Sequence, residues 1–246
     1  MNRKRAITLI IILSLILSGL LFINYNMTRP TKLNKIIASK YNAPANKAFN
    51  DQNFYNCIVD SYNSLTPNKI SYTTNISNEQ LEKIDNLYCQ QKNIKSAKGI
   101  EKLTNLEILS IDKNKLTSLN LSKNLKLIDV NIKENSLTTL DVSKSVNLTT
   151  LYVKDNQLTS LKLPSASSNK LESLNVGDNK LTSLDVSKNV KLTELYVASN
   201  QLTSLDVSKN VKLIELYAGS NQLTSLDVSK NVKLTELYIA SNQLTS

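Results

Sequence analysis

The strongest constraint on this fold is a 21-residue period in the second half of the chain. Residues 181–201, 202–222 and 223–243 are three nearly identical units, each beginning LTSLDVSKNVKL. The leading leucine keeps this phase at Leu116, Leu137, Leu158, Leu181, Leu202, Leu223 and Leu244. A fixed period of about 20 to 50 residues is typical of a solenoid, because each unit buries its apolar face against its neighbours. We therefore predict a solenoid.

The period changes once, between Leu158 and Leu181, where the spacing is 23 residues. Residues 164–169 (PSASSN) replace the usual SKNV turn and add two residues, which a surface loop absorbs at little cost.

Each unit contains one short predicted strand. The run Leu192-x-x-Leu195-x-Val197-x-x-Asn200-x-Leu202 alternates apolar and polar residues around Leu195 and Val197, which indicates a strand with one buried face. Stacked units place such strands about 4.8 Å apart in a parallel sheet. The extended LTSLDVS stretch of each unit then returns along the outer face.

A column of asparagines follows the strands in phase. The short amide of each one satisfies backbone groups that the turn leaves unpaired, so we predict a structural role rather than a ligand role. The column consists of Asn114, Asn135, Asn156, Asn179, Asn200, Asn221 and Asn242.

The N-terminus is predicted to direct export. Residues 1–5 are basic, and residues 6–23 are eighteen uncharged residues that reach about 27 Å as a helix, close to the thickness of a bilayer core. We favour an uncleaved transmembrane signal anchor over a cleaved signal peptide. The basic residues Arg3, Lys4 and Arg5 place the repeats outside the cell, and the protein is secreted instead if the signal is cleaved. Residues 24–48 form a polar, basic tether.

Residues 49–105 are predicted to cap the solenoid and begin the repeats. Residues 51–62 read as an amphipathic helix, Ser77 and Gln80 have capping-box spacing, and residues 84–89 repeat the strand pattern. Cys57 and Cys89 are candidates for a disulfide, which an exported protein permits. The alternative is two reduced cysteines that fill the cap. Repeats of 21 residues occupy 106–246, and the last unit is incomplete, which we interpret as truncation.

Composition argues against an enzyme. The chain has no His and no Trp, and its two cysteines fit no metal or redox motif. No nucleophile with a base and no phosphate-binding loop is present, so we predict no catalytic residues, no metal and no cofactor. The net charge of +10 is concentrated in residues 1–48, which hold eight basic residues and no acid. The remainder is almost neutral, and we therefore expect no nucleic-acid partner.

The predicted binding surface consists of the side chains that point outward from the sheet. A tyrosine column offers rigid amphipathic area beside small residues, which favours binding; the alternative is that the tyrosines only stack on one another. The candidates are Thr150, Tyr152, Lys154, Glu194, Tyr196, Ala198, Glu215, Tyr217, Gly219, Glu236, Tyr238 and Ala240.

The opposite face repeats an aspartate and a lysine in each unit, at Asp185 and Lys188 in the first of the three. We interpret it as solvated surface, because the glycine-rich spacing of calcium-binding solenoids is missing.

The LTSLDVSKN and L-x-x-L-Y segments resemble those of bacterial surface leucine-rich-repeat proteins, the internalins, and most closely the J type, over about residues 49–246. The resemblance implies a β-dominated α/β-type solenoid: a leucine-rich-repeat horseshoe with a parallel sheet on the concave face, a short, mostly non-helical convex side and a small α-helical N-terminal cap. In the J type a cysteine recurs along the core, at positions that hold Val197, Ala218 and Ile239 here.

The resemblance also implies a surface binding or adhesion module for a protein or glycan on a host or neighbouring cell. Two departures limit this transfer: the chain shows no C-terminal cell-wall sorting signal, and its apolar N-terminus is a candidate anchor. The alternative is a structural or recognition segment of a larger envelope protein, and fold alone does not decide between them.

Overall fold

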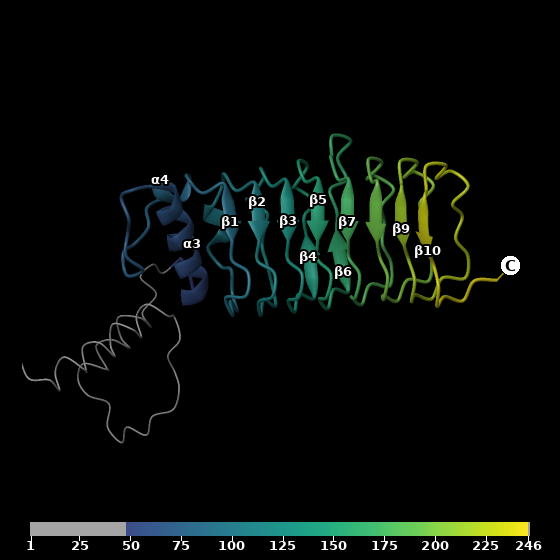
Figure 1. The fold of residues 1–246 in the computed structure, drawn as a ribbon, viewed down its shortest axis with the longest axis horizontal. Coiled ribbons are helices and arrows are strands. Elements are labelled where there is room, and N and C mark those ends of the chain that lie inside the picture. Colours follow the sequence, from purple (N-terminus) through teal and green to yellow (C-terminus); the bar gives the residue numbers. More distant parts are fainter. Residues whose placement is uncertain (1–47, 246) are drawn as a thin grey trace, which may run out of the picture. The chain divides into compact units, whose positions relative to one another are not determined.

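The computed structural model describes residues 48–245, which form a solenoid of stacked coils behind an α-helical cap (Figure 1). The predicted basic segment, membrane anchor and tether of residues 1–48 lie outside the described residues, apart from Ala48. Across residues 48–245, no helix combines the length and the apolar character needed to cross a bilayer.

The cap consists of two helices. Helix α3 spans Gln52–Leu65, and the Asp51 carboxylate caps it by accepting from the backbone N–H groups of Asn53 and Phe54. Helix α4 spans Asn78–Leu81 and begins with the predicted capping box at Ser77. A single 3-10 turn, Ile100–Lys102, follows before the regular coils.

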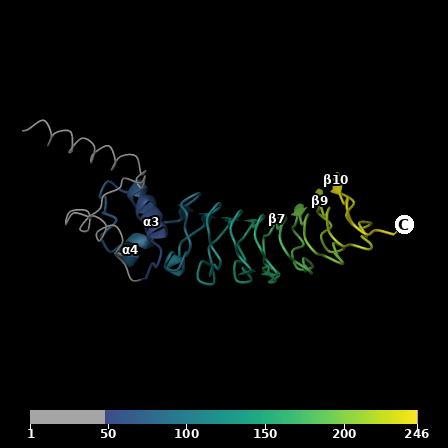
Figure 2. The same cartoon turned by 90° about the horizontal axis from the view of Figure 1, so that it is seen from below.

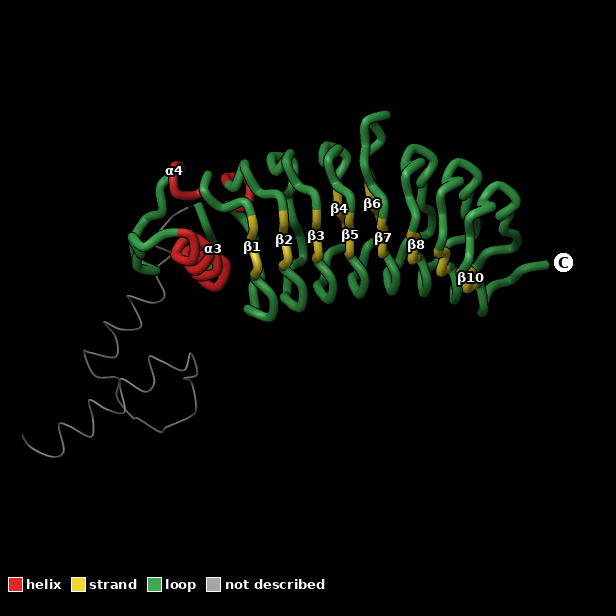
Figure 3. The backbone as a smooth tube through the Cα atoms, turned by 45° about the horizontal axis from the view of Figure 1, so that its top comes forward, coloured by secondary structure: helices red, strands yellow, loops and turns green. Residues whose placement is uncertain are grey.

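One eight-stranded parallel sheet runs the length of the solenoid, as Figure 3 shows, and most of each coil is loop. Each strand pairs with its neighbours in register, so equivalent residues of successive coils lie side by side. The strands in order are β1 (Asn86–Tyr88), β2 (Ile108–Ser110), β3 (Asp129–Asn131), β5 (Thr150–Tyr152), β7 (Ser173–Asn175), β8 (Glu194–Tyr196), β9 (Glu215–Tyr217) and β10 (Glu236–Tyr238).

The opposite side of the solenoid is mostly irregular. Strands β4 (Thr139–Asp141) and β6 (Ser160–Lys162) form a second, two-stranded parallel sheet there, while the returning segments of the other coils form none. The large sheet lies on the inner side of a gentle curve (Figure 2). The predicted fold class is therefore confirmed: a horseshoe with its parallel sheet on the concave face, a mostly non-helical convex side and an α-helical cap.

The core is a continuous column of aliphatic side chains between the two sides. The predicted inward residues Leu195 and Val197 are fully buried, as are Leu216 and Ala218 one coil later. In β10 the equivalent Leu237 is 42% exposed, because no described coil packs over it. Burial of the leucines thus depends on the neighbouring coil rather than on the unit itself.

The predicted asparagine column ties adjacent coils together. The Asn200 side-chain Nδ2 donates to the Val197 carbonyl of its own coil and, at 3.0 Å, to the Val176 carbonyl of the preceding coil. Its Oδ1 accepts from the Leu181 backbone N–H at 3.0 Å. The residue before each of these asparagines has a positive φ, as Ser199 does at 55°, although none is glycine. The hydrogen bonds of the asparagine side chains therefore stabilise a left-handed backbone conformation at the preceding residue. This conformation costs a residue other than glycine about 1 to 2 kcal/mol.

A second asparagine column, to which sequence analysis assigned no role, lies in the SKN turns before the strands. Asn210 is fully buried, and its Nδ2 donates to the backbone carbonyls of Val186 and Asn189 at 3.0 and 2.9 Å. Asn231 repeats this arrangement with Val207 and Asn210. Both turns of a coil are therefore bonded to the preceding coil through buried amides.

The cap is joined covalently to the first coil. Cys57 of α3 and Cys89, which follows β1, form a disulfide with a Cα–Cα distance of 5.8 Å. The sequence separation of the two cysteines is 32 residues. The bond fixes the helix over the end of the core, where Ile84 and Leu87 are completely buried.

Replacing Asn200 by alanine is expected to lower the free energy of unfolding by about 2 to 4 kcal/mol, because backbone groups of two coils lose their partners in the interior. Chemical denaturation measures this change. Gln201→Ala, at the exposed neighbouring position, is the control and should change stability by less than about 0.5 kcal/mol. Equal effects of the two substitutions would contradict the structural role of the column.

Removing the disulfide is expected to lower the free energy of unfolding by about 3 to 4 kcal/mol, since a loop of this length is no longer closed in the unfolded chain. Denaturation with and without reductant measures the difference. A Cys57→Ala, Cys89→Ala double variant should show no response to reductant. A wild-type chain equally indifferent to reductant would show that the bond contributes nothing.

Candidate functional site

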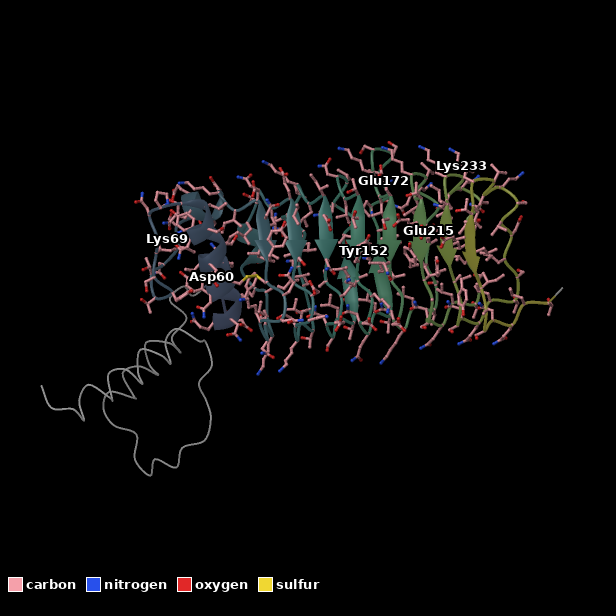
Figure 4. The ribbon with its side chains drawn as sticks, viewed as in Figure 1. Asp60, Lys69, Tyr152, Glu172, Glu215 and Lys233 are labelled. Atoms are coloured by element: carbon pink, nitrogen blue, oxygen red, sulfur yellow. A yellow bond between two sulfur atoms is a disulfide. The ribbon has the colours of Figure 1, made fainter. Side chains whose placement is uncertain are left out.

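The candidate site is the outward face of the concave sheet along β8, β9 and β10. In-register pairing aligns Glu194, Glu215 and Glu236 in one column. Tyr196, Tyr217 and Tyr238 form the adjacent column. Because side chains on a strand alternate between faces, both columns point away from the core. Figure 4 shows Glu215 within the strand-bearing face.

The three tyrosine rings pack against one another. The Tyr196 and Tyr217 ring centroids are 5.0 Å apart, and those of Tyr217 and Tyr238 are 6.2 Å apart. A Cβ atom at Gly219 would lie 2.9 Å from the Tyr238 ring, so a glycine is needed there for the ring to lie against the sheet. The rings form a continuous aromatic surface, and Tyr238 remains 56% exposed.

The tyrosines also bond diagonally to the glutamates of the next coil. The Tyr196 hydroxyl donates to the Glu215 carboxylate, and the Tyr217 hydroxyl donates to Glu236 at 2.5 Å. One coil earlier, the Ser173 hydroxyl donates to Glu194 at 2.7 Å. Each glutamate therefore has a donor from the preceding coil, which offsets the repulsion expected along a column of carboxylates.

These contacts raise the pKa of two phenols. Burial is the main cause of the raised pKa of Tyr196, followed by its bond to Glu215. The bond to Glu236 is the main cause of the raised pKa of Tyr217. Loss of the phenol proton would place two negative charges in contact, so the neutral hydroxyl is favoured.

The other predicted candidates lie two coils before β8. Tyr152 of β5 is separated from Tyr196 by Asn175 of β7, which sequence analysis did not include. Lys133 lies over the Tyr152 ring, 5.8 Å from its centroid. Lys154 pairs with Asp178 at 3.1 Å, which raises the pKa of its amine. The structure thus groups Glu194 to Ala240 in one surface. Thr150, Tyr152 and Lys154 lie on an earlier coil, and the Ser173 hydroxyl, 3.4 Å from the Tyr152 hydroxyl and 2.7 Å from the Glu194 carboxylate, connects the two groups.

The sequence also indicates the outward residues of the β7 coil, which were not among the predicted binding residues. Ser173, Asn175 and Gly177 lie 21 residues before Glu194, Tyr196 and Ala198, so they have the same phase as the tyrosine units, and the two extra residues of the 164–169 loop change only the spacing to the preceding coil. Because these residues are small or polar, the aromatic surface ends at Tyr196 on this side.

The convex aspartates have a structural function. Asp185, Asp206 and Asp227 each accept from the backbone N–H group two residues later, at 2.8 Å. These bonds lower the pKa values of the three carboxyls. Within residues 48–245, no group of three or more potential ligands is positioned to hold a metal ion.

Comparison with known proteins agrees with this architecture. Residues 146–189 match the family model described as leucine-rich repeats in two copies. The functional domain of InlJ from Listeria monocytogenes, described as including a cysteine ladder, is 34% identical with a TM-score of 0.61. The match covers 82% of this chain and 48% of that domain, so the chain spans about half the length of its relative.

A second internalin shares the fold. Internalin C2 from Listeria monocytogenes is 23% identical with a TM-score of 0.52, and the match covers 81% of this chain and 96% of that one. No curated protein sequence is significantly similar to the chain.

The raised pKa of Tyr196 predicts a stability loss in alkaline solution. The folded phenol holds its proton above pH 10, where an unfolded tyrosine loses it, so stability is complete below pH 10 and falls as the pH rises toward the folded pKa. Urea denaturation below and above pH 10 should show a smaller loss for Tyr196→Phe than for the unmodified chain. Glu215→Gln should lower the Tyr196 pKa in an ultraviolet titration, and an unchanged titration would contradict the bond.

Proposed function

The chain is a leucine-rich-repeat protein similar to the listerial internalins, and from this premise we propose that its concave sheet binds another protein. Leucine-rich-repeat solenoids are protein-interaction modules. The observation that carries the proposal is the aromatic surface of Tyr196, Tyr217 and Tyr238, flanked by a column of carboxylates.

The tyrosine column is suited to binding because it is ordered before a partner arrives. The rings stack, and two of the three hydroxyls are bonded to glutamates of the next coil, so few rotamers remain to be lost on association. Tyrosine supplies large contact area at low entropy cost and is enriched at interfaces. The small residues Ala198 and Ala240 beside the rings leave room for a partner to approach the sheet, whereas the Tyr238 ring covers Gly219.

The charge of the surface indicates the chemistry of the partner. Along β8, β9 and β10 the outward residues include three glutamates and no basic residue. The hydroxyls of Ser173, Tyr196 and Tyr217 occupy part of the acceptor capacity of the three carboxylates, and the remaining lone pairs can accept further donors. We infer that the partner presents basic or hydrogen-bond-donating groups between apolar contacts.

We place this interaction at a cell surface. The predicted export segment of residues 6–23 and the disulfide between Cys57 and Cys89 both suit an oxidising exterior. From that location we infer an adhesive role toward a protein on a host or neighbouring cell, with a glycan as a second class of ligand for the same aromatic surface.

The test is a binding screen of the full chain against arrayed extracellular proteins and glycans. A triple variant with Tyr196, Tyr217 and Tyr238 changed to Ala is expected to lose at least about tenfold in affinity for any saturable ligand, as removal of central aromatic anchors does. Circular dichroism and thermal unfolding establish that the variant is folded.

The matched control is a triple variant with Thr182, Thr203 and Thr224 changed to Ala, three exposed positions in the returning segments of the same coils. It should keep full affinity. Binding that survives the tyrosine triple, or no saturable ligand at all, would argue against the concave sheet and favour a structural segment of a larger envelope protein.

A further inference from the structure

A second surface lies at the edge of the solenoid where the chain enters the strands. In each of the last three coils this turn has the sequence Lys-Asn-Val-Lys, as in residues 188–191. Its asparagine is buried and bonded to the preceding coil, which directs the neighbouring side chains outward. Figure 4 shows Lys233 at this edge. We define the lysine edge as Lys188, Lys191, Lys209, Lys212, Lys230 and Lys233.

The lysines of this edge have no carboxylate partner within 4.0 Å among residues 48–245. Asp185, Asp206 and Asp227 precede the first lysine of each turn by three residues, and Glu194, Glu215 and Glu236 follow the second lysine by three residues. Each of the aspartates is bonded to the backbone of its own turn and interacts with the first lysine of its coil only through space.

The fold separates the two signs of charge in these coils. Glu194, Glu215 and Glu236 lie on the concave sheet and accept hydrogen bonds there from the preceding coil. Their charge is therefore directed to a different face from that of the lysines. Although residues 181–245 carry six lysines and six carboxylates, the edge itself has an excess of positive charge.

The edge continues with lower density toward the N-terminus. Lys123, Lys126 and Lys170 are exposed in earlier coils, but Glu172 lies in the same turn as Lys170, and Glu107 of a preceding coil lines a surface hollow together with Lys126 and Lys170. Lys126 is also bonded to the Asn105 side chain at 2.9 Å. The uninterrupted part of the edge is thus confined to the last three coils.

Exposed valines lie between the two lysines of each turn. Val190 and Val211 are 48% and 47% exposed, and Val232 is 85% exposed. These short side chains leave the lysine amines accessible on both sides and add a narrow apolar strip. Because successive strands are about 4.8 Å apart, each of the two lysine positions repeats along the stack at roughly that interval.

We propose that the lysine edge binds a linear polyanion that lies along the stack of coils. The charges form two parallel rows, one on each side of the exposed valines, so an extended polymer with closely spaced anionic groups that lies between the rows can contact all six lysines. A lysine ammonium acts as a compact point charge, so recognition depends on charge density rather than on the shape of each anionic group. This surface is distinct from the concave sheet and does not depend on its ligand.

The test uses long-chain inorganic polyphosphate and the full chain in nanodiscs of neutral phospholipid. A triple variant with Lys191, Lys212 and Lys233 changed to Gln is compared with the unmodified chain by calorimetry at several salt concentrations. We expect at least about a tenfold loss of affinity. The slope of log affinity against log salt should fall by about two, since each lost contact removes roughly 0.7 for a single-stranded polyanion.

The matched control changes Lys92, Lys115 and Lys180 to Gln, which removes the same charge from exposed positions on the opposite turns. This variant should lose less than about twofold in affinity. The basic residues of positions 1–48 contribute equally to all three proteins. Thermal unfolding verifies that each variant is folded.

Three outcomes would overturn the proposal. Equal losses in both triple variants would mean that overall charge, not the edge, attracts the polymer. Polyphosphate binding that is indifferent to the edge variant would exclude this surface. A loss confined to vesicles of anionic phospholipid, with polyphosphate binding unchanged, would assign the edge to a membrane surface instead.

Discussion

The rest of this structure depends on one constraint: each coil must stack on the next with the backbone polar groups of its turns hydrogen-bonded. Every coil turns twice, and a buried turn has peptide groups without a ladder partner. Two columns of buried asparagines, represented by Asn200 and Asn210, bond these groups across adjacent coils. This constraint fixes the phase of every other side chain, because each residue must then lie beside its equivalent in the next coil, 21 positions away in most coils.

Because equivalent residues of successive coils lie side by side, one residue type per unit forms a continuous surface along the stack. One outward tyrosine per unit becomes an aromatic column, and one glutamate per unit becomes a column of carboxylates beside it. Without the diagonal bonds from Tyr196 to Glu215 and from Tyr217 to Glu236, the carboxylates would only repel one another. The same repetition, applied to the turns before the strands, produces the lysine edge. A repeat protein therefore displays each side chain of one unit many times along a surface. The strand register that stabilises the stack also aligns these side chains for binding.

Much of the fold could be predicted from the sequence. The alternation around Leu195 and Val197 identified the strands and the inward positions, and the Ser77 capping box marked a helix start. The outward positions of the tyrosines followed from the same alternation. Other features could not be predicted, because they depend on distances between coils. Examples are the hydrogen bonds of the phenols and those of the second asparagine column.

The sequence by itself determined the solenoid, its phase and the residues that line its core, because a 21-residue period with alternating leucines has no other way to bury them. Only the tertiary structure decided how charge is distributed. The repeats are nearly neutral in sequence, yet stacking directs the glutamates to the concave sheet and the unpaired lysines to one edge. The physical reason is that net charge is a sum over the whole sequence, whereas the electrostatic potential of a surface depends on which charged side chains the stacked coils place next to one another.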